Sequence, residues 1–194
     1  MPELAFYEDE TFEDFQADER DLVDCRFTGC TFQACTLTEA SFRGSQLSEC
    51  RFEDCELGVI DLTDALLHAV VFEACRLRGV NFSVIKEDAV GLSMELEACD
   101  LSFATFRHLD LRACAFRSCH AREAEFASCN LSGVDLSGTD FAEALFQGND
   151  LRNADLRGAR NYLLSPYDNR LKGARVELPE ALGLLVGIGV RLHS

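Results

Sequence analysis

Ten cysteines are the most reactive side chains in this sequence, and thiolates are common zinc ligands and redox groups. A structural zinc ion needs four ligands in a tetrahedron, often from cysteines two to four residues apart. Here every interval is a multiple of five except the one from Cys75 to Cys99, so the spacing indicates a repeat. We expect compact apolar side chains, with a redox or metal site on stacked pairs such as Cys35 and Cys55 as the alternative. The cysteines are Cys25, Cys30, Cys35, Cys50, Cys55, Cys75, Cys99, Cys114, Cys119 and Cys129.

The histidines and the glycines give no sign of a catalytic centre. His68, His108, His120 and His193 have no regular spacing to cysteine or aspartate, which predicts surface positions. No G-x-S-x-G, phosphate-loop or H-E-x-x-H motif occurs. The sequence therefore predicts no catalytic residue, no cofactor and no resident metal, and a binding protein rather than an enzyme.

A period of five residues organises most of the chain. Leu or Phe recurs at every fifth position from Leu22 to Phe82 and again from Leu96 to Leu156, with Ala121 as the exception. A second, mostly small residue precedes each of these centres by two positions, and all ten cysteines fall there. This period fits neither a helix nor a strand, so each pentapeptide must turn the chain and return two side chains inward. The pattern predicts a solenoid.

The motif A/C-x-L/F-x-x is clearest in residues 134–141 and 154–158, and it resembles the pentapeptide-repeat proteins over roughly residues 12–160. That resemblance implies an all-β solenoid, a right-handed quadrilateral β-helix with four pentapeptides per coil and a short C-terminal capping α-helix. Centres twenty residues apart then stack, as in Phe32, Phe52 and Phe72. We expect the β-helix over residues 1–160, interrupted at 83–95, and a C-terminal turn and helix for capping and dimerisation over 161–194.

The charge balance is strongly acidic, with 34 acidic and 18 basic residues and a net charge of −16. Direct nucleic-acid binding is therefore not expected, because it needs clustered Lys and Arg. Neither a secretory signal nor an apolar run of about 18–20 residues occurs, so we expect no membrane association and a cytoplasmic location. Duplex DNA carries one charge per ~1.7 Å, and an acidic rod approaches that density, which predicts mimicry of DNA.

Candidate partner-binding residues are the acids that recur at outward positions of the repeat. One face is expected to carry Asp21, Asp24, Asp61 and Asp64, and another Glu53, Asp54 and Glu73. Part of this pattern is structural, because Asp and Asn side chains bond backbone groups at turns. The interruption between Phe82 and Leu96 adds Lys86, Glu87 and Asp88, which we expect in an exposed loop that contributes specificity or is a neutral bulge.

The C-terminal segment 178–188 is apolar, with Pro179 at a plausible first helical position and Glu180 in the first turn. It predicts a short helix that caps the open end of the solenoid, where strand edges would otherwise be unpaired. Apolar surface remains, so we expect a homodimer through this helix. The candidate dimer contacts are Leu178, Leu182, Leu185, Val186 and Ile188.

The repeat, its single interruption, the acidity and the tail NYLLSPYDNRLKGARVELPEALGLL together resemble the Qnr-type group. This group includes quinolone-resistance proteins and the immunity proteins of microcin and albicidin producers. The resemblance implies a homodimer that binds DNA gyrase or topoisomerase IV and protects it from quinolone or natural-product poisons. Strongly protective Qnr proteins carry two projecting loops, whereas this repeat runs unbroken from Leu22 to Phe82, which favours an immunity role. A non-enzymatic scaffold for another protein partner is the alternative.

Overall fold

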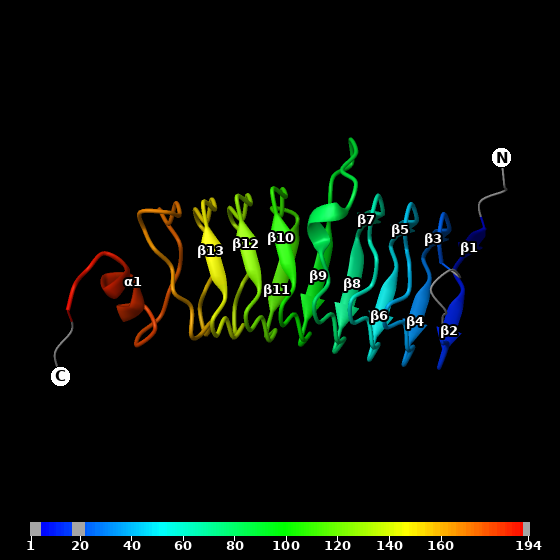
Figure 1. The fold of residues 1–194 in the computed structure, drawn as a ribbon, viewed down its shortest axis with the longest axis horizontal. Coiled ribbons are helices and arrows are strands. Elements are labelled where there is room, and N and C mark those ends of the chain that lie inside the picture. The colour runs from blue at the N-terminus through cyan, green and yellow to red at the C-terminus, as the bar shows by residue number, and fades with distance from the viewer. Residues whose placement is uncertain (1–4, 17–21, 192–194) are drawn as a thin grey trace.

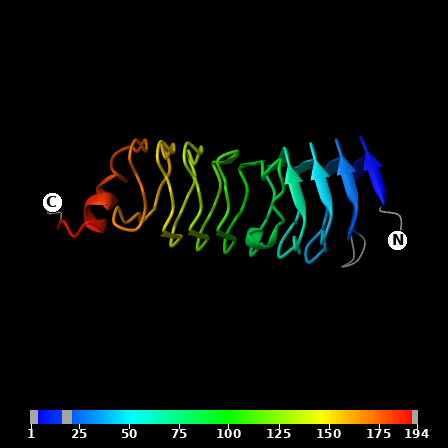
Figure 2. The same cartoon turned by 90° about the horizontal axis from the view of Figure 1, so that it is seen from above.

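The chain forms a rod in which successive coils lie side by side along one axis, with the N- and C-terminal ends at opposite ends (Figures 1 and 2). The structure is a computed structural model, and it describes residues 5–16 and 22–191. Every strand pair is parallel, so the fold is a parallel β-solenoid with the predicted repeat. No helix within these residues is long and apolar enough to cross a membrane.

Four stacks of paired segments make the four sides of each coil. The six-strand face has the order β11-β9-β8-β6-β4-β2 and continues through bridges from Ala115 to Arg175. The four-strand face has β1-β3-β5-β7 and, further along the rod, bridges from Asp110 to Arg170. The three-strand face begins with the Ser41–Asp61 bridge and continues as β10-β12-β13. The bridge face consists of isolated bridges from Gln16 to Arg160.

The strands are short because each pentapeptide contributes one side of a coil. Their bounds are β1 Phe6–Glu8, β2 Thr11–Glu13, β3 Arg26–Thr28, β4 Thr31–Gln33, β5 Gln46–Ser48, β6 Arg51–Glu53, β7 Leu66–His68, β8 Val70–Glu73, β9 Met94–Glu97, β10 Thr105–Arg107, β11 Cys114–Arg117, β12 Glu125–Ala127 and β13 Leu145–Gln147. A 3₁₀ helix, η1, covers Phe82–Val84, and the helix α1 covers Leu182–Gly187.

Stacking at intervals of twenty residues is confirmed by the strand register. Phe32 pairs with Phe52, and Phe52 pairs with Phe72, with ring centroids 4.6 and 5.0 Å apart. Where the repeat is interrupted, Phe72 pairs with Leu96, so this coil spans 24 residues and contains four more than the others. The interruption therefore leaves the four faces continuous from one half of the rod to the other.

The inward Leu and Phe side chains form one continuous core. Phe32, Phe106, Phe126 and Leu131 are fully buried, and a second stack of rings runs Phe82, Phe106, Phe126 and Phe146. Each buried side chain of this kind contributes about 1.5–3 kcal/mol through the hydrophobic effect. The core thus supplies the main favourable term in folding, and it does so along the full length of the rod.

The small inward site has a hydrogen-bonding role that the sequence pattern does not reveal. The thiol of Cys55 donates to the carbonyl of Phe32 at 3.3 Å, one coil earlier. Thr139 and Asn149, at equivalent positions, donate to the carbonyls of Phe116 and Phe126, both at 2.8 Å. Because each of these side chains can donate to the same inward carbonyl, Cys, Thr and Asn replace one another at this site.

The paired region continues past residue 160, because Asp150 bridges to Arg170 and Asp155 bridges to Arg175. The turn and helix beyond this region cap the end of the core, where Leu184 of α1 packs against buried side chains. The helix starts at Leu182 and not at Pro179, because the preceding amides bond three residues back, as in the bond from the Leu182 amide to the Pro179 carbonyl.

Candidate protein-binding surface

Acidic side chains gather on the six-strand face. Between β2 and β11, seven carboxylates lie on its strands or directly after them, and two arginines lie among them. At about 4.8 Å per strand, these six strands cover about 24 Å of the rod. The acids are Glu13, Asp14, Glu53, Asp54, Glu73, Glu95 and Glu97, and the arginines are Arg51 and Arg117.

The two arginines neutralise only part of this face. Arg51 lies between Glu53 and Glu73 and bonds both carboxylates. Arg117 bonds Glu95 and Asp135, each at 2.9 Å. No ion pair within the described residues involves Glu13, Asp14, Asp54 or Glu97. These four carboxylates are exposed, so the face presents uncompensated negative charge to solvent.

The acids predicted as contacts divide between two faces. Glu53, Asp54 and Glu73 come together on the six-strand face, whereas Asp24, Asp61 and Asp64 belong to the three-strand face. Asp21 lies outside the described residues. The prediction omitted Glu13, Asp14, Glu95 and Glu97. The twenty-residue stacking could have identified the first two, but the last two required the length of the interrupted coil.

Asp61 is committed to holding its own turn. Its carboxylate accepts from the Thr63 amide at 3.0 Å and from the Ser41 hydroxyl at 3.3 Å. The bonds from Thr63 hold the pKa of Asp61 below its usual range. This carboxylate therefore has a structural role in the repeat, as an aspartate before a turn commonly does.

Most acids in the second half of the rod are paired with arginine. Asp155 accepts from Arg157 at 2.7 Å and from Arg175 at 2.9 Å, and its side chain is 8% exposed. The bond from Arg157 is the main reason that the pKa of Asp155 is lowered. Asp150 forms the same kind of contact with Arg152 at 2.6 Å. The negative field is consequently strongest along the first half of the rod.

The interruption forms a loop that projects beyond the coils after η1 (Figure 1). Ile85 and Leu92 are buried at its two ends, and Lys86, Glu87 and Asp88 are exposed between them. Asp88 accepts from the amides of Val90 at 2.9 Å and Gly91 at 3.2 Å. The Val90 bond is the first cause of its lowered pKa. The loop thus has a defined conformation.

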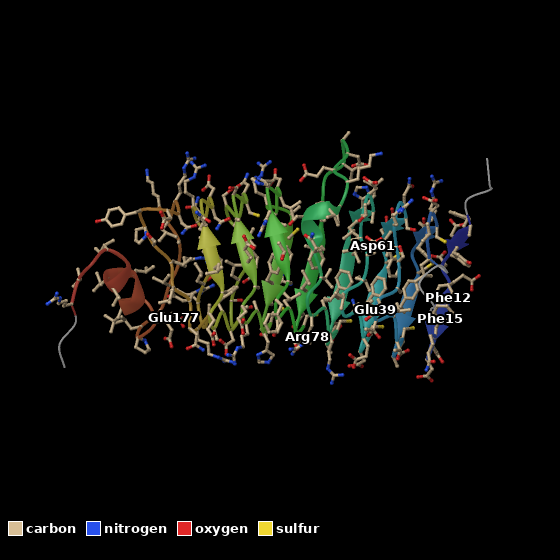
Figure 3. All side chains as sticks on the ribbon, in the orientation of Figure 1. Phe12, Phe15, Glu39, Asp61, Arg78 and Glu177 are labelled. Carbon is tan, nitrogen blue, oxygen red and sulfur yellow. The ribbon has the colours of Figure 1, made fainter. Side chains whose placement is uncertain are left out.

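The C-terminal segment presents an apolar surface at the end of the rod opposite Phe12 and Phe15 (Figure 3). Five predicted dimer contacts are exposed there, with exposed fractions of 75% for Leu178, 40% for Leu182, 39% for Leu185, 55% for Val186 and 41% for Ile188. Leu184 of the same helix faces the core instead. The helix therefore has one side on the solenoid and another side open.

The thiols lie inside the rod. All ten cysteines are buried and free of disulfides. Burial raises the pKa of Cys35 and Cys50 to about 11 and that of Cys114 to about 12. Over residues 5–16 and 22–191, no group of three or more His, Cys, Asp or Glu side chains could hold a metal ion.

Comparisons with known proteins agree with this architecture. A family model described as a pentapeptide repeat region matches residues 25–93, and one for pentapeptide repeats in eight copies matches residues 99–138 and 124–160. No curated protein sequence gives a significant match. Among solved structures, a trypsin-treated variant of QnrB1, a plasmid-mediated fluoroquinolone resistance protein, is 18% identical with a TM-score of 0.62, covering 98% of this chain and 100% of that chain. Full-length QnrB1 is 17% identical with a TM-score of 0.57, covering 96% and 100%.

Proposed function

Because this chain belongs to the pentapeptide-repeat proteins, we propose that its six-strand face occupies the DNA-binding surface of a type II topoisomerase. The enzyme would be DNA gyrase or topoisomerase IV, and occupation would protect it from quinolone or natural-product poisons. The observation that carries this proposal is the row of seven carboxylates against two arginines on one flat sheet face.

Electrostatics support the choice of partner. A surface that binds DNA is lined with Lys and Arg, and its field attracts any rigid body with a matching row of negative charges. The four carboxylates without ion pairs, Glu13, Asp14, Asp54 and Glu97, need no partner to be removed before they can meet such a surface. The rod also shares its fold with QnrB1, whose description names fluoroquinolone resistance.

We also propose that two copies join through the C-terminal surface formed by Leu178, Leu182, Leu185, Val186 and Ile188. Large exposed apolar side chains at the end of an otherwise acidic rod favour contact with a like surface. Such a dimer would place the two acidic six-strand faces on the outer arms, away from the joint.

A scaffold role is the second candidate, and one observation favours it. On the bridge face, Val59 and Phe103 are 58% and 46% exposed, and Arg78 lies 5.5 Å above the Phe103 ring. Both apolar residues have a positive φ, of 52° and 63°, although side chains of this size rarely adopt that conformation. This surface would suit an apolar protein partner unrelated to DNA.

A supercoiling assay with purified gyrase tests the main proposal. The protein is titrated from substoichiometric amounts, with and without ciprofloxacin or albicidin. We expect it to restore supercoiling in the presence of one of these poisons, and to do so less well as salt is raised. Inhibition alone would indicate a DNA mimic without protection, which contradicts half of the proposal. No effect at low salt would reject it and favour the scaffold.

Matched charge variants locate the surface. The triple variant Glu13→Gln, Asp54→Asn, Glu97→Gln removes three charges that make no ion pair. The control Glu39→Gln, Glu123→Gln, Glu143→Gln removes three from the corner of the bridge face. We expect the first variant to need at least about tenfold more protein for the same effect, because rim charges set the association rate. Equal activity of the two variants would exclude the six-strand face.

A further inference from the structure

His68, the last residue of β7, contacts the projecting loop of residues 86–91 through both of its ring nitrogens. Nδ1 lies 2.9 Å from the carbonyl oxygen of Gly91, and Nε2 lies 3.3 Å from Oδ2 of Asp88. The His68 side chain is 18% exposed, so the ring is largely covered. Both contacts reach the part of the loop that lies farthest along the chain from its first residue.

The base of the loop is held by other means. At its start, the Lys86 amide donates to the Ala65 carbonyl at 2.9 Å, and at its end the Ser93 amide donates to the Leu67 carbonyl at 3.2 Å. Ile85 and Leu92 are buried beside these bonds. The loop therefore remains anchored at both ends whatever its tip does.

The tip depends on Asp88. One carboxylate oxygen of Asp88, Oδ1, accepts from the Val90 and Gly91 amides, while the other faces His68. Within the described residues, the remaining side-chain contact of the loop with the coils is a long one, from the Asp110 amide to Glu87 at 3.4 Å. His68 is thus the main side chain of the rod that holds the tip.

The two acceptors determine which form of the ring fits. A carbonyl and a carboxylate can only accept hydrogen bonds, so each facing nitrogen must carry a hydrogen to bond. A neutral imidazole has one N–H, whereas the imidazolium has two. With Nδ1 donating to Gly91, a neutral ring would turn a nitrogen lone pair toward the Asp88 carboxylate. The geometry therefore fits the protonated ring.

The charged groups around the ring act in the same direction. Glu87 and Asp88 of the loop and Asp110 and Arg112 of the next coil line one cavity of about 390 Å³. Arg112 is bound to Asp110 through both guanidinium nitrogens and is neutralised by it. Lys86 precedes these residues in the loop, and Glu49 lies in the coil before His68, whose carbonyl accepts from its amide at 2.8 Å. The balance of charge around the ring is negative.

We propose that His68 and Asp88 form a pH-sensitive latch, which holds the tip of the 86–91 loop on the rod while the imidazole is protonated and releases it as the ring loses its proton. Histidine changes charge within the physiological pH range, and the Asp88 carboxylate stays charged across it. Release would free Val90, which is 75% exposed at the tip. The latch does not depend on the identity of the partner that the rod binds.

A tryptophan reporter tests the latch directly, because the chain contains no tryptophan. Ala89→Trp places one at an exposed loop position, and its fluorescence anisotropy is followed from pH 5.5 to 8.5. We expect high anisotropy at low pH and a single transition to lower anisotropy as pH rises. His68→Gln in this background should abolish the transition, and Asp88→Asn should shift it to lower pH. The control His108→Gln, on the three-strand face, should leave it unchanged.

Two outcomes would overturn the proposal. The first is an anisotropy that does not change with pH, and the second is the same transition in His68→Gln. Circular dichroism of each variant separates loss of the latch from loss of the fold, and Asp88→Asn keeps the test open if His68→Gln misfolds. In the unaltered protein, long-range ¹H–¹⁵N spectra of the four imidazoles should show both nitrogens of His68 protonated at low pH.

Discussion

The thiol of Cys119 donates to the carbonyl of Leu96 at 3.4 Å, and in the next coil the hydroxyl of Thr139 donates to the carbonyl of Phe116 at 2.8 Å. Thr139 also accepts from the Cys119 amide at 3.1 Å. A preference for small residues at this position thus combines limited space with an inward carbonyl that needs a donor. The five-residue period predicted the limited space, whereas the carbonyl became visible only with the coils in register.

We predict that Thr139→Val lowers the free energy of unfolding by about 1–3 kcal/mol, because Val has the same shape and leaves the Cys119 amide and the Phe116 carbonyl without their partner. Thr139→Cys, which copies the rest of its column, should cost less. Urea unfolding followed by circular dichroism measures both. A neutral Thr139→Val would show that the hydrogen bonds at this site contribute nothing to stability.

The buried thiols should be unreactive in the native protein. Burial raises the pKa of Cys50 to about 11 and that of Cys114 to about 12, so hardly any nucleophilic thiolate exists at pH 8. We expect no fast reaction with Ellman's reagent before denaturation and ten reactive thiols in guanidinium chloride. One thiol that reacts within seconds in the native state would revive the redox alternative.

Asp155 should make stability depend on pH in the acid range. Arg157 lowers its pKa in the folded protein, while an unfolded aspartate titrates near about 3.9. Its stabilisation is therefore complete above about pH 5 and is lost as the pH falls through the folded-state value. We expect Asp155→Asn to cost about 1–3 kcal/mol at pH 7 and much less at pH 3, measured by urea unfolding. Glu39→Gln, at an exposed position, should show no such difference.

At the scale of elements, the sequence predicted the stacked coils because inward Leu and Phe leave only one register. It did not predict which pentapeptides form strands, since strands and turns place the same residues inward. For example, Gln46–Ser48 is a strand, whereas the Ala40 amide bonds the Leu37 carbonyl in a turn. The candidate surface was predicted in part: Glu53, Asp54 and Glu73 share a face, but Glu95 and Glu97 could be placed only once the interrupted coil was known to contain 24 residues.

The loop should be removable without loss of the fold. Deleting residues 87–90 returns the interrupted coil from 24 to 20 residues, the length of its neighbours, and the β8–β9 pairing does not involve these residues. We expect unchanged circular dichroism and a melting temperature close to that of the parent. In the supercoiling assay, a changed response to poison with an unchanged fold would assign the loop to specificity. A collapse of the β-sheet signal would contradict this view of the loop as an insertion.

At the scale of the whole molecule, the acidic six-strand face and the apolar C-terminal surface lie on different parts of one rigid rod. Contact between copies should therefore be separable from contact with a topoisomerase. We predict that Leu185→Glu with Val186→Glu gives a monomer by sedimentation equilibrium, because charge in an apolar interface is costly. The control Leu145→Glu, at a side chain 63% exposed on β13, should leave the dimer intact. A monomeric parent protein would refute the dimer itself.

The 20-residue interval between paired coils also determines how the rod should respond to tension. Each coil bonds only the coils before and after it, so a pull on the two ends loads the outermost coil first. Twenty residues extend to about 70 Å at roughly 3.5 Å each, and unwinding one coil releases that length while the next coil becomes the new end. The rod is thus built to lengthen in equal steps from its ends inward, like thread leaving a spool, while the remaining coils keep their shape.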